Sequence, residues 1–192
     1  MYFDDLNKKY ILLDIEGNST KAENEIRITQ FSALVFHDGV VDEVDWMNRN
    51  VNYINPYVQR LTKISVNKCK NTGMSERNLV LHIHKLLSNC DLIYAYGCDF
   101  DKRIIKYMFK KYELKPLNIS WYDVIDDVKR YLNPSKSKLS IASKEYGFNE
   151  ENYHNALVDC KATLHLMKVI EQIKEISKWF ILFVLETWKK NI

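Results

Sequence analysis

Apolar and polar residues follow strand-like patterns over the first quarter of the chain. A compact apolar run over residues 10–15 predicts a short, fully buried strand. Residues 26–36 predict a second strand, and His37-Asp38-Gly39 predicts a hairpin turn into a third strand that ends near Trp46. The chain is therefore expected to begin its fold with an antiparallel meander.

Helix-like periodicity dominates from residue 75 onward. Residues 47–74 show no clear period and are expected to be irregular, with Asn55-Pro56 as a breaker. The elements expected after them are a helix over 75–88, a buried strand over 91–96, a helix over 100–112, a short strand over 118–121, helices over 123–131 and 138–146, a long helix over 155–176 and a further helix over 178–190. This order predicts an α/β fold, a mixed β-sheet flanked by helices, in which crossover helices join the later strands.

Composition limits the class of protein. A chain of 192 residues with 46% hydrophobic residues suits one domain, assigned to residues 1–176, with a C-terminal helical extension over 177–192. The net charge of +3 favours nucleic acid only weakly. The apolar run over 179–185 is far shorter than the roughly 20 residues that span a bilayer, so no membrane partner is expected.

Cysteine spacing and the N-terminus bear on location. The four cysteines show no paired spacing, so neither a zinc site nor a disulfide framework is predicted. The acidic start of the chain differs from the basic start of a secretory signal. Unpaired thiols are typical of a reducing compartment, and a cytoplasmic location is expected.

Asp14 and Glu16 close the first predicted strand. Residues two apart on a strand point to the same face, with Cα atoms roughly 6.6 Å apart at about 3.3 Å per residue. Their carboxylates could share one metal ion or bridge two ions roughly 3.5–4 Å apart. The alternative, that two acids mark where a strand reaches solvent, explains this short pattern equally well.

A third acidic residue, Asp101, lies at the head of the helix expected over 100–112. It precedes Ile104 and Ile105 of the apolar stripe by one turn, so it shares the buried side of that helix. A carboxylate that faces a core is costly unless a cation or hydrogen-bond donors meet it. The alternative is a first-turn aspartate favoured by the helix dipole.

His154 and Asp159 are five positions apart. If both were helical they would lie roughly 140° apart around the axis, at about 100° per residue, and could not converge. The sequence therefore predicts His154 in the loop before the last long helix, Asn155 as its N-cap and Asp159 in an early turn. Taken alone, this motif also fits a surface histidine beside a helix start.

Together these motifs resemble the DEDD family of 3′→5′ exonucleases, in its histidine-containing (DEDDh) branch, over about residues 8–175. The resemblance rests on three segments, Leu13-Asp14-Ile15-Glu16, Gly97-Cys98-Asp99-Phe100-Asp101 and His154-Asn155-Ala156-Leu157-Val158-Asp159. The chain has Gly97 where the family often has asparagine, and it lacks the threonine pair that often follows the first motif. The resemblance implies a ribonuclease H-like fold.

The resemblance also implies a metal-dependent hydrolysis. Two divalent cations, Mg²⁺ or Mn²⁺, would be held by Asp14, Glu16, Asp101 and Asp159. His154 would be the general base that activates the attacking water. The products would be nucleoside 5′-monophosphates released from the 3′ end of single-stranded RNA or DNA. Substrate contacts are implied for Gly17, Asn18, Ile64 and Phe100.

Further features bear on the nucleic acid itself. Residues 55–65 resemble the Leu-Thr-x-Ile stretch of these exonucleases, especially in the branch that trims RNA 3′ ends, which makes Ile64 a candidate wedge at the terminal nucleotide. Of the twelve tyrosines most are expected to pack in the core, but Tyr53, Tyr57 or Tyr96 could stack a base. A basic cluster could track phosphates or be an ordinary solvated surface; it comprises Lys129, Arg130, Lys136, Lys138 and Lys144.

Three functions remain open at this point. The chain could be a stand-alone exonuclease, a proofreading subunit bound to a DNA polymerase, or a catalytically inactive nucleic-acid-binding module. The last predicts broken ligand positions, whereas all the ligand positions are intact in this sequence. The apolar residues within 178–190 are expected to pack on the core, on a second copy in a homodimer or on a partner.

Overall fold

The fold is organised around one mixed sheet. The computed structural model of the chain describes residues 2–3, 5, 7–19 and 26–189, with side chains described as far as residue 179. The sheet has the strand order β3-β2-β1-β4-β5. Its strands are β1 (Tyr10–Gly17), β2 (Ile28–His37), β3 (Val40–Met47), β4 (Leu92–Ala95) and β5 (Ser120–Asp123). The first three form an antiparallel meander, and β4 and β5 run parallel to β1, as the sequence predicted.

The hairpin between β2 and β3 follows from two residues. Asp38 (φ 48°) and Gly39 (φ 74°) both adopt left-handed conformations, and His37 pairs directly with Val40. Two successive positive φ values match the right-handed twist of the flanking strands, which is why Asp-Gly is a frequent hairpin sequence. This turn fixes the register of the meander and is confirmed as predicted.

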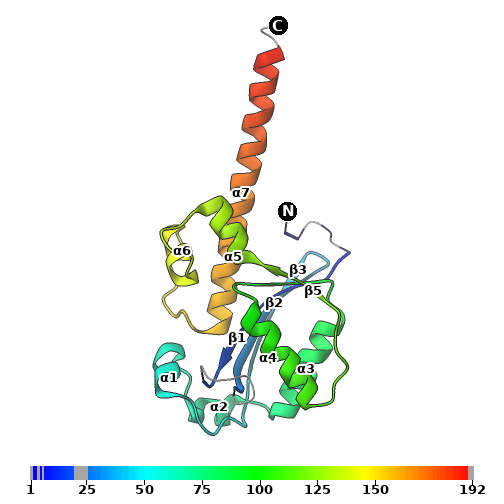
Figure 1. Cartoon of the computed structure of the whole chain (residues 1–192), viewed down its shortest axis with the longest axis vertical. Helices are drawn as coiled ribbons and strands as arrows, with labels where there is room; N and C mark the ends of the chain where they lie inside the picture. Colours follow the sequence, from blue (N-terminus) through cyan, green and yellow to red (C-terminus); the bar gives the residue numbers. More distant parts are fainter. Residues whose placement is uncertain (1, 4, 6, 20–25, 190–192) are drawn as a thin grey trace.

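Helices cover both faces of the sheet (Figure 1). They are α1 (Pro56–Thr62), α2 (Val66–Thr72), α3 (Glu76–Ser88), α4 (Asp99–Lys111), α5 (Val124–Asp127), the π-helix η2 (Val128–Leu132), α6 (Leu139–Glu145) and α7 (Ala156–Lys189). Ile11 and Leu13 of β1 pack with α3 and α4 in one hydrophobic cluster. Leu12, on the other face, packs with η2, α6 and α7. Because β1 is central, it is buried on both faces.

Residues 47–74 are more ordered than the sequence suggested. They contain α1 and α2, which pack a small hydrophobic cluster of their own around Ile54 and Cys69. Asn55-Pro56 was expected to break regular structure, but it begins α1. The Asn55 side chain accepts a hydrogen bond from the Tyr57 backbone, and proline occupies the first helical turn, where its missing N–H is not needed. Helices of seven residues are too short to show periodicity.

The C-terminal region forms one helix rather than the two expected. No glycine or proline interrupts the chain after residue 155, and α7 continues as a single helix of 34 residues whose distal half projects beyond the rest of the molecule (Figure 1). Ile176 and Trp179 on it are 68% and 74% exposed. The apolar side chains from residue 180 onward lie outside the described side chains, so the packing of the extension stays a prediction.

Smaller boundaries also shift. β5 begins two residues later than the strand expected over 118–121, and the helix expected over 123–131 divides into α5 and η2. Among the described residues, no helix has both the length and the apolar composition needed to cross a bilayer. All four cysteines are free.

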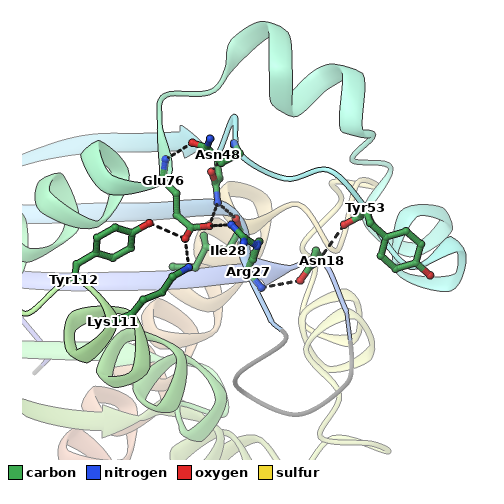
Figure 2. A network of polar contacts seen from close by, with 9 residues as sticks. Asn18, Arg27, Ile28, Asn48, Tyr53, Glu76, Lys111 and Tyr112 are labelled. Carbon is green, nitrogen blue, oxygen red and sulfur yellow. Dashed lines mark hydrogen bonds and ion pairs between the residues drawn. The ribbon is translucent and has the colours of Figure 1, made fainter.

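A buried ion-pair network joins the elements on one side of the fold (Figure 2). Glu76, at the start of α3, is 2% exposed and accepts hydrogen bonds from Arg27 (2.8 Å) and Tyr112 (2.8 Å). Lys111 pairs with the same carboxylate, and Asn48 donates to it at 3.2 Å. Burial alone would raise the pKa of Glu76, but these donors outweigh it and hold the pKa below its usual value.

We expect Glu76→Ala to lower the free energy of unfolding by about 1–3 kcal/mol, because it removes the buried acceptor of several hydrogen bonds, while the partly exposed Arg27 and Lys111 can still be solvated. Urea unfolding followed by fluorescence measures the change. The neighbouring exposed Arg77 provides a matched control, since Arg77→Ala should alter stability by no more than about 0.5 kcal/mol. Equal stability of the two variants would contradict the importance of this network.

Candidate active site

The site begins where β1 extends beyond its parallel neighbour. β4 pairs with β1 only from Tyr10 to Leu12, so the last residues of β1 have an open edge on that side. Asp14 and Glu16 have the same strand parity as Leu12, which packs against α7. Both carboxylates therefore point toward the start of α7, and both residues are half-buried.

Asp101 reaches the same place from α4. It lies in the first turn of that helix, is 4% exposed, and is close enough to the backbone of Ile15, the residue between the two β1 acids, for that backbone to favour the ionised form and act to lower its pKa. The start of α4 is held by Asp123, whose carboxylate accepts the N–H groups of Gly97 (2.8 Å) and Cys98 (3.0 Å). The prediction that Asp101 faces inward is confirmed.

Gly97 explains one departure from the related family. Its φ of +76° lies in the left-handed region, which glycine adopts freely and asparagine tolerates better than other residues with a side chain. Glycine and asparagine therefore serve the same backbone need at this position.

His154 lies in the loop before α7, as predicted. Its φ of 63° is unusual for a residue with a side chain, and its backbone N–H donates to the Asp159 carboxylate at 3.2 and 3.4 Å. Asn155 caps the helix by accepting the backbone N–H groups of Leu157 (3.2 Å) and Val158 (3.3 Å). Asp159 thus occupies the first turn and holds the histidine loop against it.

These elements bring the five candidate residues together. Ligand atoms of Glu16, His154 and Asp159 all lie within 4.8 Å of one another. Asp14 interacts electrostatically with the other three acids, Glu16, Asp101 and Asp159. Residues from β1, α4 and the start of α7 therefore converge on one point at the end of the sheet.

The electrostatics of this cluster favour a cation. Burial, followed by repulsion from neighbouring carboxylates, raises the pKa of Asp14 well above its usual value and the pKa of Glu16 to about 8. Burial is also the main cause that raises the pKa of Asp101 to about 8 and that of Asp159 to about 7. Such a set of buried carboxylate oxygens suits hard divalent cations such as Mg²⁺ or Mn²⁺.

The histidine has the opposite shift. Burial, followed by the nearby positive charge of Lys138, lowers the pKa of His154 below its usual value. A neutral imidazole can accept a proton at neutral pH. Lys138 also acts on Asp159, which places this one member of the predicted basic cluster beside the site.

Comparison with known proteins identifies the family. A family model described as Exonuclease (RNase_T) matches residues 11–167. The chain belongs to this exonuclease family. It is 30% identical over 171 residues to the DNA polymerase III PolC-type protein of Clostridium perfringens, covering 86% of this chain and 11% of the relative. A PolC-type protein of Staphylococcus epidermidis is 22% identical over 172 residues, covering 88% and 12%. This exonuclease chain thus spans about a tenth of the length of these relatives.

Solved structures show the same fold. E. coli exonuclease I bound to single-stranded DNA superimposes with a TM-score of 0.76 at 20% identity, covering 86% of this exonuclease chain and 41% of that protein. Its complex with a dA16 oligonucleotide gives 0.77 at 19% identity, covering 88% and 42%. The predicted ribonuclease H-like fold and the DEDDh-type exonuclease family are confirmed.

The residues expected to contact substrate include two that lie side by side and others whose side chains make contacts within the protein. Gly17 and Phe100 lie side by side, because a Cβ added to Gly17 would be 3.5 Å from the Phe100 ring and 3.0 Å from Ile26. Asn18 is buried, accepts the Arg27 backbone N–H at 2.7 Å and donates to the carbonyl of Tyr53 at 3.2 Å (Figure 2). Its side chain is used within the protein, where it holds the segment before α1.

Ile64 also has an internal role. It is 0% exposed and belongs to the small cluster beneath α1 and α2, so its side chain supports this segment from below. A wedge role for Ile64 stays a prediction. Of the three candidate tyrosines, Tyr53 and Tyr57 are each 59% exposed, whereas the Tyr96 hydroxyl donates to the Ser137 carbonyl at 2.6 Å.

Sequence reasoning missed Gln30. It is 1% exposed, pairs across the sheet with Glu16, and its side-chain oxygen accepts the backbone N–H of Ala156 at 3.2 Å. Its amide nitrogen donates to Asp45 at 2.7 Å. Gln30 thereby fixes the start of α7 to the strand beside the carboxylates. A glutamine within the apolar run of 26–36 was the available signal.

The raised carboxylate pKa values predict an inverse dependence of stability on pH. Between the unfolded values of about 4 and folded values near 8, the folded protein binds more protons than the unfolded chain. The metal-free protein should therefore lose stability as pH rises through this range. Differential scanning calorimetry in the presence of a chelator measures it.

Asp14→Asn should flatten this dependence and raise Tm near pH 8, by about 2–4 °C for each kcal/mol of repulsion removed. Mg²⁺ should stabilise the natural protein more than the variant, because it binds the folded state. The control is Asp99→Asn, at an exposed acid of the first turn of α4. A metal-free protein equally stable at about pH 5 and about pH 8 would refute this account.

Proposed function

We propose that this chain is a metal-dependent 3′→5′ exonuclease that releases nucleoside 5′-monophosphates from single-stranded nucleic acid. One observation carries the proposal: within a chain of the exonuclease family, carboxylates from β1, α4 and α7 converge with an imidazole. All five candidate positions hold residues able to do the chemistry, which disfavours an inactive binding module.

The proposed roles follow from the geometry. Two divalent cations would be held by Asp14, Glu16, Asp101 and Asp159, and such ions, when bound, polarise water and neutralise charge on phosphate oxygens. His154 would accept the proton of the attacking water at an imidazole nitrogen, for which its lowered pKa keeps it neutral. The water oxygen bonds to phosphorus as the P–O3′ bond breaks, leaving a 5′-phosphate on the released nucleotide and a new 3′ hydroxyl on the strand.

The approach to this site supports a single strand. The exposed Tyr53 and Tyr57 precede and begin α1, and the Lys63 ammonium donates to Asn152 at 3.0 Å, which links the end of α1 to the loop before His154. Base stacking on tyrosine requires an unpaired base. A strand entering between α1 and the histidine loop would present its end to Gly17 and Phe100, which lie side by side.

We favour DNA over RNA as the substrate. The PolC-type relatives are DNA polymerases by name, and E. coli exonuclease I has been crystallised with DNA oligonucleotides. The likeness of residues 55–65 to RNA-trimming enzymes supports RNA, but it covers a single short segment.

Substitutions at the site residues should reduce exonuclease activity by different amounts. A 3′-labelled single-stranded oligonucleotide with Mn²⁺ should yield labelled mononucleotide, and Asp14→Asn should reduce release to background. His154→Ala should slow it by about 10²–10⁴-fold, the usual contribution of a general base. Asp99→Asn, the matched control, should retain activity. Full activity of Asp14→Asn, or no release by the natural protein with either Mn²⁺ or Mg²⁺, would disprove the proposal.

Sugar preference is tested separately. Oligonucleotides of matched sequence in DNA and RNA form are offered in one reaction, and their degradation is followed by gel electrophoresis. We expect faster release from DNA. Faster release from RNA would reverse the substrate assignment while leaving the exonuclease proposal intact.

A second candidate is the same activity in a proofreading role beside a DNA polymerase. The 30% identity to a PolC-type protein, of which the matching region is 11%, favours it. The exposed Ile176 and Trp179 on α7 provide a surface where a polymerase or a second copy of the chain could pack. A cytoplasmic location stays a prediction.

A further inference from the structure

A groove lies along α4, and Asp101 is not among the residues that line it. It has a volume of about 880 Å³ and runs between α4 and residues 113–119, the segment that leads to β5. None of the five candidate catalytic residues lines it. The groove is therefore a separate feature from the site at the end of β1.

The floor of the groove is apolar. It is formed by Ile105 and Phe109 of α4 together with Leu117 and Trp121 from the opposite wall. Leu117 and Trp121 are only partly buried, although they pack against the main hydrophobic cluster. The core thus continues to the surface here, and a groove of this size can take large apolar side chains.

The rim of the groove is basic. Lys102, Lys106 and Lys110 follow one another at four-residue spacing on α4, and Lys115 lies on the opposite wall. Within the described parts of the chain, no ion pair is found for any of these four lysines, and Glu113 is the single acidic residue among those lining the groove. Like charges at four-residue spacing destabilise a helix unless an anion lies between them.

The groove is already formed without an occupant. His84 hydrogen-bonds the Lys115 carbonyl at 2.9 Å and packs edge-on against Phe109, with ring centroids 4.9 Å apart. The backbone N–H of Leu114 donates to the Phe109 carbonyl at 2.9 Å. These contacts hold residues 113–119, the wall opposite α4, in place. Binding of a ligand would therefore cost little free energy for ordering that wall.

The geometry points to a docking site for an acidic peptide segment of a partner protein, in which large apolar side chains fill the floor and carboxylates meet the lysines on the rim. Charge complementarity favours this occupant, because an acidic chain would relieve the repulsion among the α4 lysines. Nucleic acid fits less well. Its bases need exposed aromatic faces, whereas Phe109 is 5% exposed and the Trp121 ring already has the Lys102 ammonium 5.6 Å from its centroid.

The test uses the full chain and a panel of short fluorescein-labelled peptides, in which glutamates alternate with leucine and phenylalanine at different spacings. We expect at least one peptide to bind with a Kd of about 100 μM or tighter by fluorescence anisotropy, more weakly at higher salt. In heteronuclear NMR spectra the indole N–H signal of Trp121 should shift on binding.

Variants decide where the peptide binds. Lys106→Ala with Lys110→Ala should weaken binding at least tenfold, while Lys70→Ala with Lys168→Ala, which removes the same charge from exposed positions outside the groove, should not. Exonuclease activity on a free oligonucleotide should be the same in both double variants. Failure of every peptide to bind, equal effects of the two double variants, or displacement of the peptide by oligothymidylate would each overturn the proposal. The proposal would also be overturned if copies of the chain associate with one another and this association prevents the peptide from binding.

Discussion

Mutual repulsion among buried carboxylates is the constraint on which this structure depends. Burial raises the pKa of Asp14, Glu16, Asp101 and Asp159, and neighbouring carboxylates raise the pKa of Asp14 and Glu16 further, so the convergence of these acids works against folding wherever they are ionised. Three separate anchors oppose it. Antiparallel pairing of β1 with β2 positions the first two acids, Asp123 holds the start of α4, and Gln30 holds the start of α7. Each of these anchors acts on the backbone and not on the carboxylate oxygens of the four acids.

The segment around α1 is held by a different means. Its small hydrophobic cluster is separate from the two that cover the sheet, so it could shift if polar contacts did not connect it to the rest. Asn18 provides that connection, since it joins the backbones of Arg27 and Tyr53, while the Arg27 side chain pairs with the buried Glu76 (Figure 2). Asn18, two residues after Glu16, thus links the end of the sheet that carries the carboxylates to the surface where the substrate is proposed to lie.

The features that could be predicted from the sequence are those that depend on residues close together in the chain. Strand parity placed Asp14 and Glu16 on one face, and the geometry of a helix start placed His154 outside α7 with Asn155 as its cap. The helices α1 and α2 could not be predicted because seven residues give no period, and Asn55-Pro56 serves equally as a breaker or a helix start. The burial of Ile64 and the role of Gln30 depend on residues distant in sequence, which no pattern within a window reveals.

The helix α4 serves two surfaces at once. Asp101 in its first turn reaches β1, whereas Lys102, Lys106 and Lys110 follow a neighbouring face toward the groove. Of these lysines only Lys102 lies in the same turn as Asp101, and the basic face extends away from the carboxylates along the helix. Ile104 and Met108, on a third face of α4, are buried in the core and anchor the helix there. A partner bound in the proposed docking groove would therefore contact the same helix that carries Asp101.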